Sequence, residues 1–111
     1  MASLDTYRQL IENILIEYTK IPYAYSDIQT EAVFDPQHNR YLLVNVGWDN
    51  GRRIHSGLVH IDIINDKLWI QRDDTEEGVT QELVNAGIPK DHIVLGFHPA
   101  EVRPHTEYAA G

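Results

Sequence analysis

Four stretches with strand character, joined by very short polar connections, constrain the fold of this chain more than any other feature. The connections at 49–52 and 65–66 contain Asn-Gly and Asn-Asp, which are typical of tight hairpin turns. Connections this short join antiparallel neighbours, since a parallel pair needs a crossover of a dozen residues or more. The pattern therefore predicts a four-stranded antiparallel meander. The expected strands comprise residues 28–34, 41–48, 53–64 and 67–72, with a polar loop at 35–40.

A helix is predicted before the strands. Apolar side chains recur at three- and four-residue spacing between Leu4 and Tyr18, which makes one apolar face. Ser3 is a suitable N-cap, and Pro22 is expected to close the segment because the residue before a proline is pushed out of helical geometry.

A second helix and an irregular end are predicted after the strands. Asp74 and Glu77 have the spacing of a capping box, and Gly87 is typical of a helix C-cap. Residues 93–97 are expected to form a short last strand, followed by an extended C-terminal tail. The expected fold class is α+β in one domain, residues 1–111. The apolar stripe of the second helix is expected to comprise Val79, Leu83 and Ala86.

Both faces of the predicted strand at 41–48 are apolar. Tyr41 and Leu43 point to one face, and the side chains from Leu42 to Trp48 at even positions point to the other. Two helices on one face would leave the second face wet. That face is therefore expected to be covered either by the tail or by a second copy of the chain, as in a homodimer.

Composition excludes several classes of protein. A formal charge of -8 argues against a protein that grips nucleic acid on its own, because phosphate binding needs a basic surface. The absence of cysteine excludes disulfide scaffolds, thiolate metal sites and cysteine nucleophiles. No apolar run approaches the length that spans a bilayer, and the start does not resemble a signal peptide, so a cytoplasmic protein is expected.

His60 and Asp62 are the strongest candidates for a metal site or a small metal- or ligand-dependent enzyme. Two residues apart on a strand, they share one face. A third ligand could be His55 or Glu82, but His55 has the wrong parity unless a β-bulge intervenes. The simpler interpretation is a partly solvated polar pair without a metal or other cofactor. The acidic run at 73–77 is likewise interpreted as the start of a helix.

Arg52 and Arg53 form the only adjacent basic pair, at the tip of a predicted hairpin. A β-ribbon with a basic tip can enter a DNA groove, so direct DNA binding stays an alternative hypothesis. A solvated turn accounts for the pair equally well. The chain has no acidic residue two positions before any of its three lysines, the pattern of a common nuclease fold, and no nucleophile motif of a hydrolase.

The two tryptophans and the tail are the candidates for protein contacts. Trp48 and Trp69 are large anchors where they are exposed, although a tryptophan is more often part of the core. The tail is interpreted as a strap on its own fold, a dimer arm or a docking segment. Its candidate contact residues are Phe97, His98 and Arg103.

Several segments together resemble one protein family. No single segment is diagnostic, but their order and the chain length make the match specific. The segments are Tyr18-Thr19-Lys20-Ile21-Pro22-Tyr23-Ala24-Tyr25, the run from Asp35 to Val46-Gly47-Trp48, His60-Ile61-Asp62-Ile63-Ile64, Lys67-Leu68-Trp69-Ile70-Gln71, and the run from Gly87 to Pro99, which continues to Val102-Arg103-Pro104. In these segments the chain resembles the XisI family, the fdxN-element excision controlling factors of cyanobacteria.

The resemblance implies a role in developmentally regulated DNA rearrangement. In that system a large serine recombinase, XisF, exchanges the strands, and XisH and XisI are accessory proteins that control it. The family supplies no catalytic residue that could be assigned here. The resemblance therefore implies a non-catalytic accessory factor, and a XisH-like protein is the expected partner.

Overall fold

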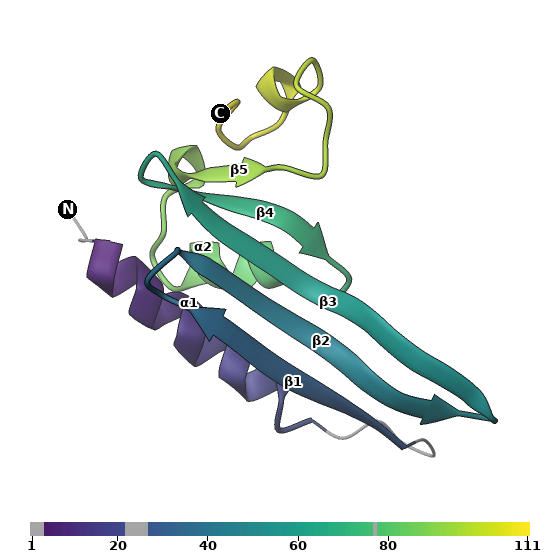
Figure 1. Ribbon diagram of the computed structural model, residues 1–111. Coiled ribbons are helices and arrows are strands. Elements are labelled where there is room, and N and C mark those ends of the chain that lie inside the picture. The colour runs from purple at the N-terminus through teal and green to yellow at the C-terminus, as the bar shows by residue number, and fades with distance from the viewer. Residues whose placement is uncertain (1–3, 22–26, 77) are drawn as a thin grey trace.

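A five-stranded sheet with two helices on one face forms the body of the molecule (Figure 1). The computed structural model describes residues 4–21, 27–76 and 78–111. The strands are β1 (Asp27–Asp35), β2 (Arg40–Asp49), β3 (Arg52–Ile64), β4 (Lys67–Asp73) and β5 (Ile93–Leu95). The helices are α1 (Leu4–Tyr18) and α2 (Val79–Asn85), with single 3-10 turns η1 (Lys90–His92) and η2 (Arg103–His105).

The predicted meander is confirmed, and a fifth strand that runs parallel to its neighbour β4 completes the sheet. The order is β1-β2-β3-β4-β5, with β1 to β4 antiparallel and β5 parallel to β4. The segment through α2 is the crossover that a parallel pair requires. The last strand was predicted at 93–97, but it ends at Leu95.

The two short turns explain why the meander forms. Asn50 and Gly51 have φ values of 51° and 78°, and Asn65 and Asp66 have 51° and 64°. Positive φ at both central residues matches the twist of a two-residue hairpin, and Asn, Asp and Gly adopt it at least cost. The local sequence thus fixes which strands are neighbours.

Helix α1 follows its predicted stripe. Tyr7, Ile11 and Leu15 are buried against the sheet. The proposed cap Ser3 and the proposed terminator Pro22 lie outside the described residues. In the part of the chain that the structure describes, no helix is both long and apolar enough to cross a membrane.

The start of α2 differs from the prediction. The helix begins at Val79 after Gly78, so Asp74 is not its N-cap, and Glu77 lies outside the described residues. Asp74 instead pairs with Arg72 at 2.7 Å. The neighbouring carboxylate of Asp73 accepts the backbone N–H of Thr80 at 3.4 Å and takes over the role of a cap.

The end of α2 agrees with the prediction at Gly87. Its φ is 108°, its N–H donates to the Val84 carbonyl at 3.0 Å, and the Ile88 N–H donates to the Leu83 carbonyl at 3.2 Å. These two bonds form a Schellman motif, which favours glycine at this position. Ala86 is exposed rather than buried, because α2 ends at Asn85 and Ala86 is only its C-cap.

The core lies between the helices and one sheet face. Tyr41 and Leu43 are fully buried on this face, as the alternation of β2 requires. The even-numbered residues from Leu42 to Trp48 point to the opposite face. The core side chains of the helix side include Tyr7, Ile11, Leu15, Tyr41, Leu43, Val59, Ile61, Ile63, Leu68, Ile70, Val79, Leu83 and Ile88.

Two β-bulges alter the parity of the strands. On β3 the register shifts so that Leu43 faces Val59 and Val44 faces Gly57, which leaves Leu58 as the extra residue. A second shift on β4 makes Gln71 the extra residue. A bulge places neighbouring side chains on one face, so Leu58 and Val59 both point to the helix side.

The C-terminal tail folds back on the sheet instead of running extended. It makes several turns, includes η2 and returns beside β5, where the Ala109 N–H donates to the Ile93 carbonyl at 2.8 Å. Phe97 and Val102 are 50% and 39% exposed, so these apolar side chains do not hold the tail. Among the interpretations of the tail, the strap describes its contacts best.

Candidate functional site

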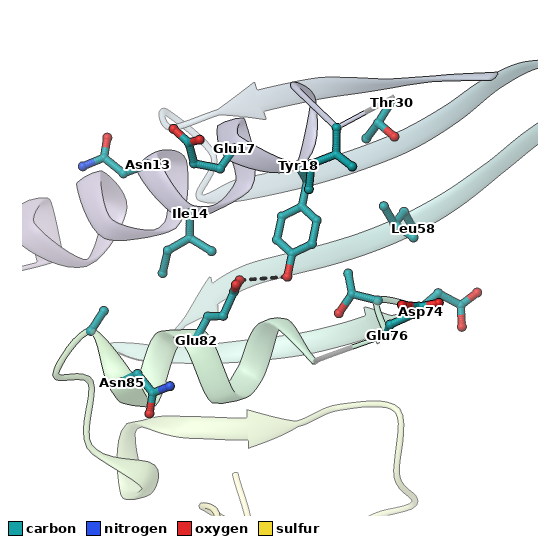
Figure 2. A pocket seen from close by; sticks show the side chains of 13 residues that line it. Asn13, Ile14, Glu17, Tyr18, Thr30, Leu58, Asp74, Glu76, Glu82 and Asn85 are labelled. Carbon is teal, nitrogen blue, oxygen red and sulfur yellow. Dashed lines mark hydrogen bonds between the residues drawn. The ribbon is translucent and has the colours of Figure 1, made fainter. Parts of the chain in front are cut away.

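A pocket of about 800 Å³ opens between α1, α2 and the sheet (Figure 2). It lies on the helix side, where the two helices diverge. Its walls come from elements far apart in the chain, so only the folded protein has it. The residues that line it are Asn13, Ile14, Glu17, Tyr18, Ile21, Thr30, Leu58, Asp74, Thr75, Glu76, Glu82, Asn85 and Ala86.

The floor of the pocket is apolar because of the β3 bulge. Leu58 is the extra residue of that bulge and lines the pocket, as does Ile14 of α1, and Figure 2 shows the two on either side of the Tyr18 ring. Thr30 is buried on β1, the edge strand two positions away in the sheet, and its hydroxyl donates to the Asn45 side chain on β2 at 2.8 Å. The floor therefore offers methyl and methylene surface with its hydroxyl already satisfied.

Tyr18 and Glu82 join the two helices across the pocket. The Tyr18 hydroxyl donates to Glu82 Oε2 at 2.8 Å, as Figure 2 shows. Burial, together with the hydrogen bond to Glu82 and its negative charge, raises the pKa of Tyr18 to about 12. The phenol stays protonated near neutral pH, so it is a donor that fixes the Glu82 carboxylate.

The rim of the pocket is acidic. Four of the lining side chains are carboxylates, and none of those named above is lysine or arginine. Glu17 and Asp74 have exposed ion pairs at the outside with Lys20 and Arg72. Within the described ranges Glu76 has no ion-pair partner. An apolar floor below a negative rim suits a cation on an aliphatic stem.

His60 and Asp62 form the predicted polar pair on the other sheet face. His60 Nε2 lies 2.9 Å from Asp62 Oδ1, and Gln71 also donates to Asp62 at 3.4 Å. The bulge at Leu58 puts His55 on the same face, but its register partner is Val46 whereas that of His60 is Leu42. Four strand positions correspond to roughly 13 Å, too far for one ion.

The other proposed metal ligand lies on the wrong side. Glu82 belongs to α2 and faces the pocket, so the sheet separates it from His60. In the parts of the chain that the structure describes, no group of three or more His, Asp or Glu side chains could hold a metal ion. Two members of the predicted acidic run are engaged locally, since Asp73 accepts from the Thr75 hydroxyl at 2.6 Å and Asp74 pairs with Arg72 at 2.7 Å.

The hairpin tip carries both signs of charge. Arg53 lies over the Trp48 ring at 5.3 Å from its centroid and donates to the Gly47 carbonyl at 3.5 Å. Arg52 is exposed and faces Asp49 in the register. Arg52 thus has the acidic neighbour Asp49, and the guanidinium of Arg53 already contacts Trp48 and Gly47. This arrangement differs from a DNA-binding ribbon, whose tip presents free positive charge to the phosphates.

The remaining candidates gather where the tail meets the sheet. The Arg103 guanidinium lies 4.9 Å from the Trp69 ring centroid, and its Nε donates to the His98 carbonyl at 3.1 Å. The Phe97 and His98 rings are 4.6 Å apart. Arg103 and Trp69 thus hold the tail against the sheet. Trp48, in contrast, is 51% exposed and is not the core residue that composition favours.

The pocket itself was missed at the level of sequence. The sequence places Tyr18 in a helix stripe and in a segment shared with a family, and it offers Glu82 as a possible metal ligand. The two residues are 64 positions apart, so no spacing in the sequence links them. Only the bulge at Leu58, which the sequence did not reveal, brings a floor beneath them.

The chain is similar to known proteins over nearly its whole length. The family model described as XisI protein matches residues 1–110. A crystal structure of a XisI-like protein from Anabaena variabilis is 31% identical, with a TM-score of 0.90, and covers 98% of this chain and 100% of that one. A search of curated proteins gives no match.

A second solved structure carries a more specific description. It is the fdxN element excision controlling factor XisI from Anabaena variabilis, 33% identical, with a TM-score of 0.82. The similarity covers 97% of this chain and 98% of that one. Both neighbours therefore share the fold over nearly the whole length of the chain.

Proposed function

Because the chain belongs to the XisI family, we propose that it is a non-catalytic accessory factor that controls site-specific DNA excision by contacting another protein. The expected partner is a XisH-like protein, the second accessory protein of the system that the resemblance implies. The observation that carries the proposal is the acid-rimmed pocket between α1 and α2.

The pocket favours contact with a basic side chain of that partner. A lysine or arginine stem fits the apolar floor at Ile14 and Leu58, and its charged end reaches the carboxylates of the rim. Glu82 is held in place by Tyr18, so little side-chain freedom is lost on binding. The overall charge of -8 adds a long-range attraction for a basic surface.

The experiment is light scattering after size exclusion, with the chain alone and mixed with a XisH-like protein from the same genome. A stable complex is expected at low salt, with affinity that falls as salt rises. Absence of a complex at low salt would contradict the proposed function.

A pocket variant then locates the contact. The triple change Glu17→Gln, Glu76→Gln and Glu82→Gln removes three charges but preserves the side-chain volumes and an acceptor for Tyr18. The dissociation constant is expected to rise by about tenfold or more. The matched control, Glu101→Gln on the tail, should bind like the wild type. A complex insensitive to the triple change would keep the function but exclude the pocket.

A further inference from the structure

An apolar stripe lies on the sheet face that carries no helix. It consists of Leu42, Val44, Val46 and Trp48 on β2 with Val33 on β1, which faces Leu42 in the register. Val33 and Trp48 are 52% and 51% exposed. The tail covers the β4–β5 end of this face but does not reach the stripe, since its contacts are with Trp69, Lys67 and β5.

The charge on this face changes sign across the stripe. On the β1 side lie Asp27 and Glu31, both exposed and aligned with Trp48 and Val44. On the β3 side lies Arg53, aligned with Trp48, and His55, aligned with Val46. Toward Trp48 the face is therefore acidic along β1, apolar along β2, and basic or titratable along β3, whereas the carboxylate of Asp62 at the other end of β3 is paired with His60.

We propose that this stripe is the interface of a symmetric homodimer whose two-fold axis runs parallel to β2. A two-fold interface must be complementary to itself, because the same patch occurs on both copies. An apolar centre with acidic residues on one side and basic residues on the other is complementary to its own copy when the two-fold axis runs along the strands.

The direction of the axis follows from the charges. Rotation about an axis parallel to β2 places β1 of the second copy over β3 of the first, so acidic side chains meet basic ones. Rotation about an axis across the strands places β1 over β1 with the direction reversed, so Asp27 of one copy approaches Glu31 of the other when the axis passes between them. Like charges at close range oppose association, which leaves the parallel axis.

The register identifies the pair of residues at one end of the interface. Asp27 and Arg53 are both aligned with Trp48, from opposite sides. The rotation superposes Trp48 on its copy and brings Asp27 over Arg53 of the second copy. Two such pairs form, one for each copy, around the stripe of apolar side chains.

A second copy suits this face better than a basic partner does. The stripe carries both signs of charge, whereas the acid-rimmed pocket carries one. The pocket lies on the opposite side of the sheet, so dimerisation leaves it open. This inference is independent of the proposed function, because each can fail while the other holds.

The test is the solution mass of the chain alone, measured from about 1 µM to about 200 µM. The wild type is expected to approach twice the chain mass of 12.8 kDa in this range. Asp27→Arg and Arg53→Asp should each weaken the dimer by about tenfold or more, because each places like charges together. The double variant should restore it. Circular dichroism checks that each variant folds.

Three outcomes would overturn the proposal. One is a monomeric wild type at the highest concentration, and another is a dimer that neither single change weakens. The third is a dimer that Asp27→Arg strengthens, which would mean that β1 meets β1 and that the axis runs across the strands. The control Glu101→Arg, an exposed acidic position on the tail, should leave the mass unchanged.

Discussion

Two tryptophans lie on the same face of the sheet, and each has an arginine over its ring. The guanidinium of Arg103 lies 4.9 Å from the ring of Trp69, and that of Arg53 lies 5.3 Å from the ring of Trp48. Arg103 belongs to the tail, 34 positions after Trp69 in the chain, and other residues of the tail also lie close to the Trp69 ring. Arg53 is the cross-strand neighbour of Trp48, so this contact involves no segment other than the hairpin itself.

The difference shows how one sheet face is divided between internal cover and free surface. At Trp69 the returning chain places Gly96 and Gly111 close to the ring, so the aromatic surface is largely buried. At Trp48 half of the side chain stays exposed. A similar cation–π contact therefore belongs to the fold in one place and to an open surface in the other.

The tryptophans themselves give the largest expected contrast. Trp69→Ala should lower the free energy of unfolding by about 2–3 kcal/mol, because it empties space beneath the tail. Trp48→Ala should change it by no more than about 0.5 kcal/mol at protein concentrations where the chain is monomeric. Urea denaturation measures both, and equal losses would mean that the two sites do not differ.

Two glycines on the same face sharpen the contrast. A Cβ at Gly96 would lie 2.7 Å from the Gln71 Oε1 and 3.1 Å from the Trp69 ring, whereas one at Gly57 would lie 3.6 Å from Arg72. Gly96→Ala should therefore cost about 1–2 kcal/mol, and Gly57→Ala close to nothing. Thermal unfolding of both variants checks this, and a tolerated alanine at Gly96 would indicate a looser tail.

The two arginines are expected to differ by less. Arg103→Ala removes the contact with Trp69 and the hydrogen bond to the His98 carbonyl, at a cost of about 1 kcal/mol. Arg53→Ala should cost about half of that in the monomer, since its site is exposed. Denaturation curves give the values, and the Trp69 emission should shift only with Arg103→Ala.

The smallest expected effect concerns an ion pair at the outer end of the tail. The Glu107 carboxylate, 3.0 Å from the Lys90 ammonium, raises the pKa of Lys90. A raised lysine pKa stabilises the folded state below the ordinary lysine pKa, and this contribution is lost as pH rises past the raised value.

Glu107→Gln should therefore lower the melting temperature slightly near neutral pH, and the difference from the wild type should close as the pH rises from the ordinary lysine pKa past the raised pKa of Lys90. The difference should also shrink at about 1 M salt, because the pair is exposed. Melting curves over this range test it, with Glu101→Gln as the neutral control. A difference that grows with pH would contradict the assignment.

Much of the fold follows from local sequence. The turns at 49–52 and 65–66, the apolar face of α1 and the cap at Gly87 are each set by residues within a few positions of one another. The predicted capping residue of α2 was wrong because the sequence offers two equivalent carboxylates, Asp73 and Asp74. Which one reaches the helix depends on the β4 bulge and the pairing of Asp74 with Arg72.

The candidate site could not be derived in the same way. The polar pair of His60 and Asp62 was predicted, since both lie on one strand at a spacing of two. The pocket was not, because Tyr18 and Glu82 meet only after the sheet has assembled between their segments. The sheet face on which His55 lies depends on the bulge at Leu58, whose position the sequence does not reveal.

The sequence alone determined the strands, their turns, the helix faces and the resemblance to a family, because these depend on neighbouring residues and on their order. The tertiary structure decided the parallel direction of β5, the acid-rimmed pocket and the cover over Trp69 but not over Trp48. These features depend on contacts between segments that are distant in the sequence. Such contacts form only in the assembled fold, where different segments could cover the same sheet face and the most favourable packing decides which one does.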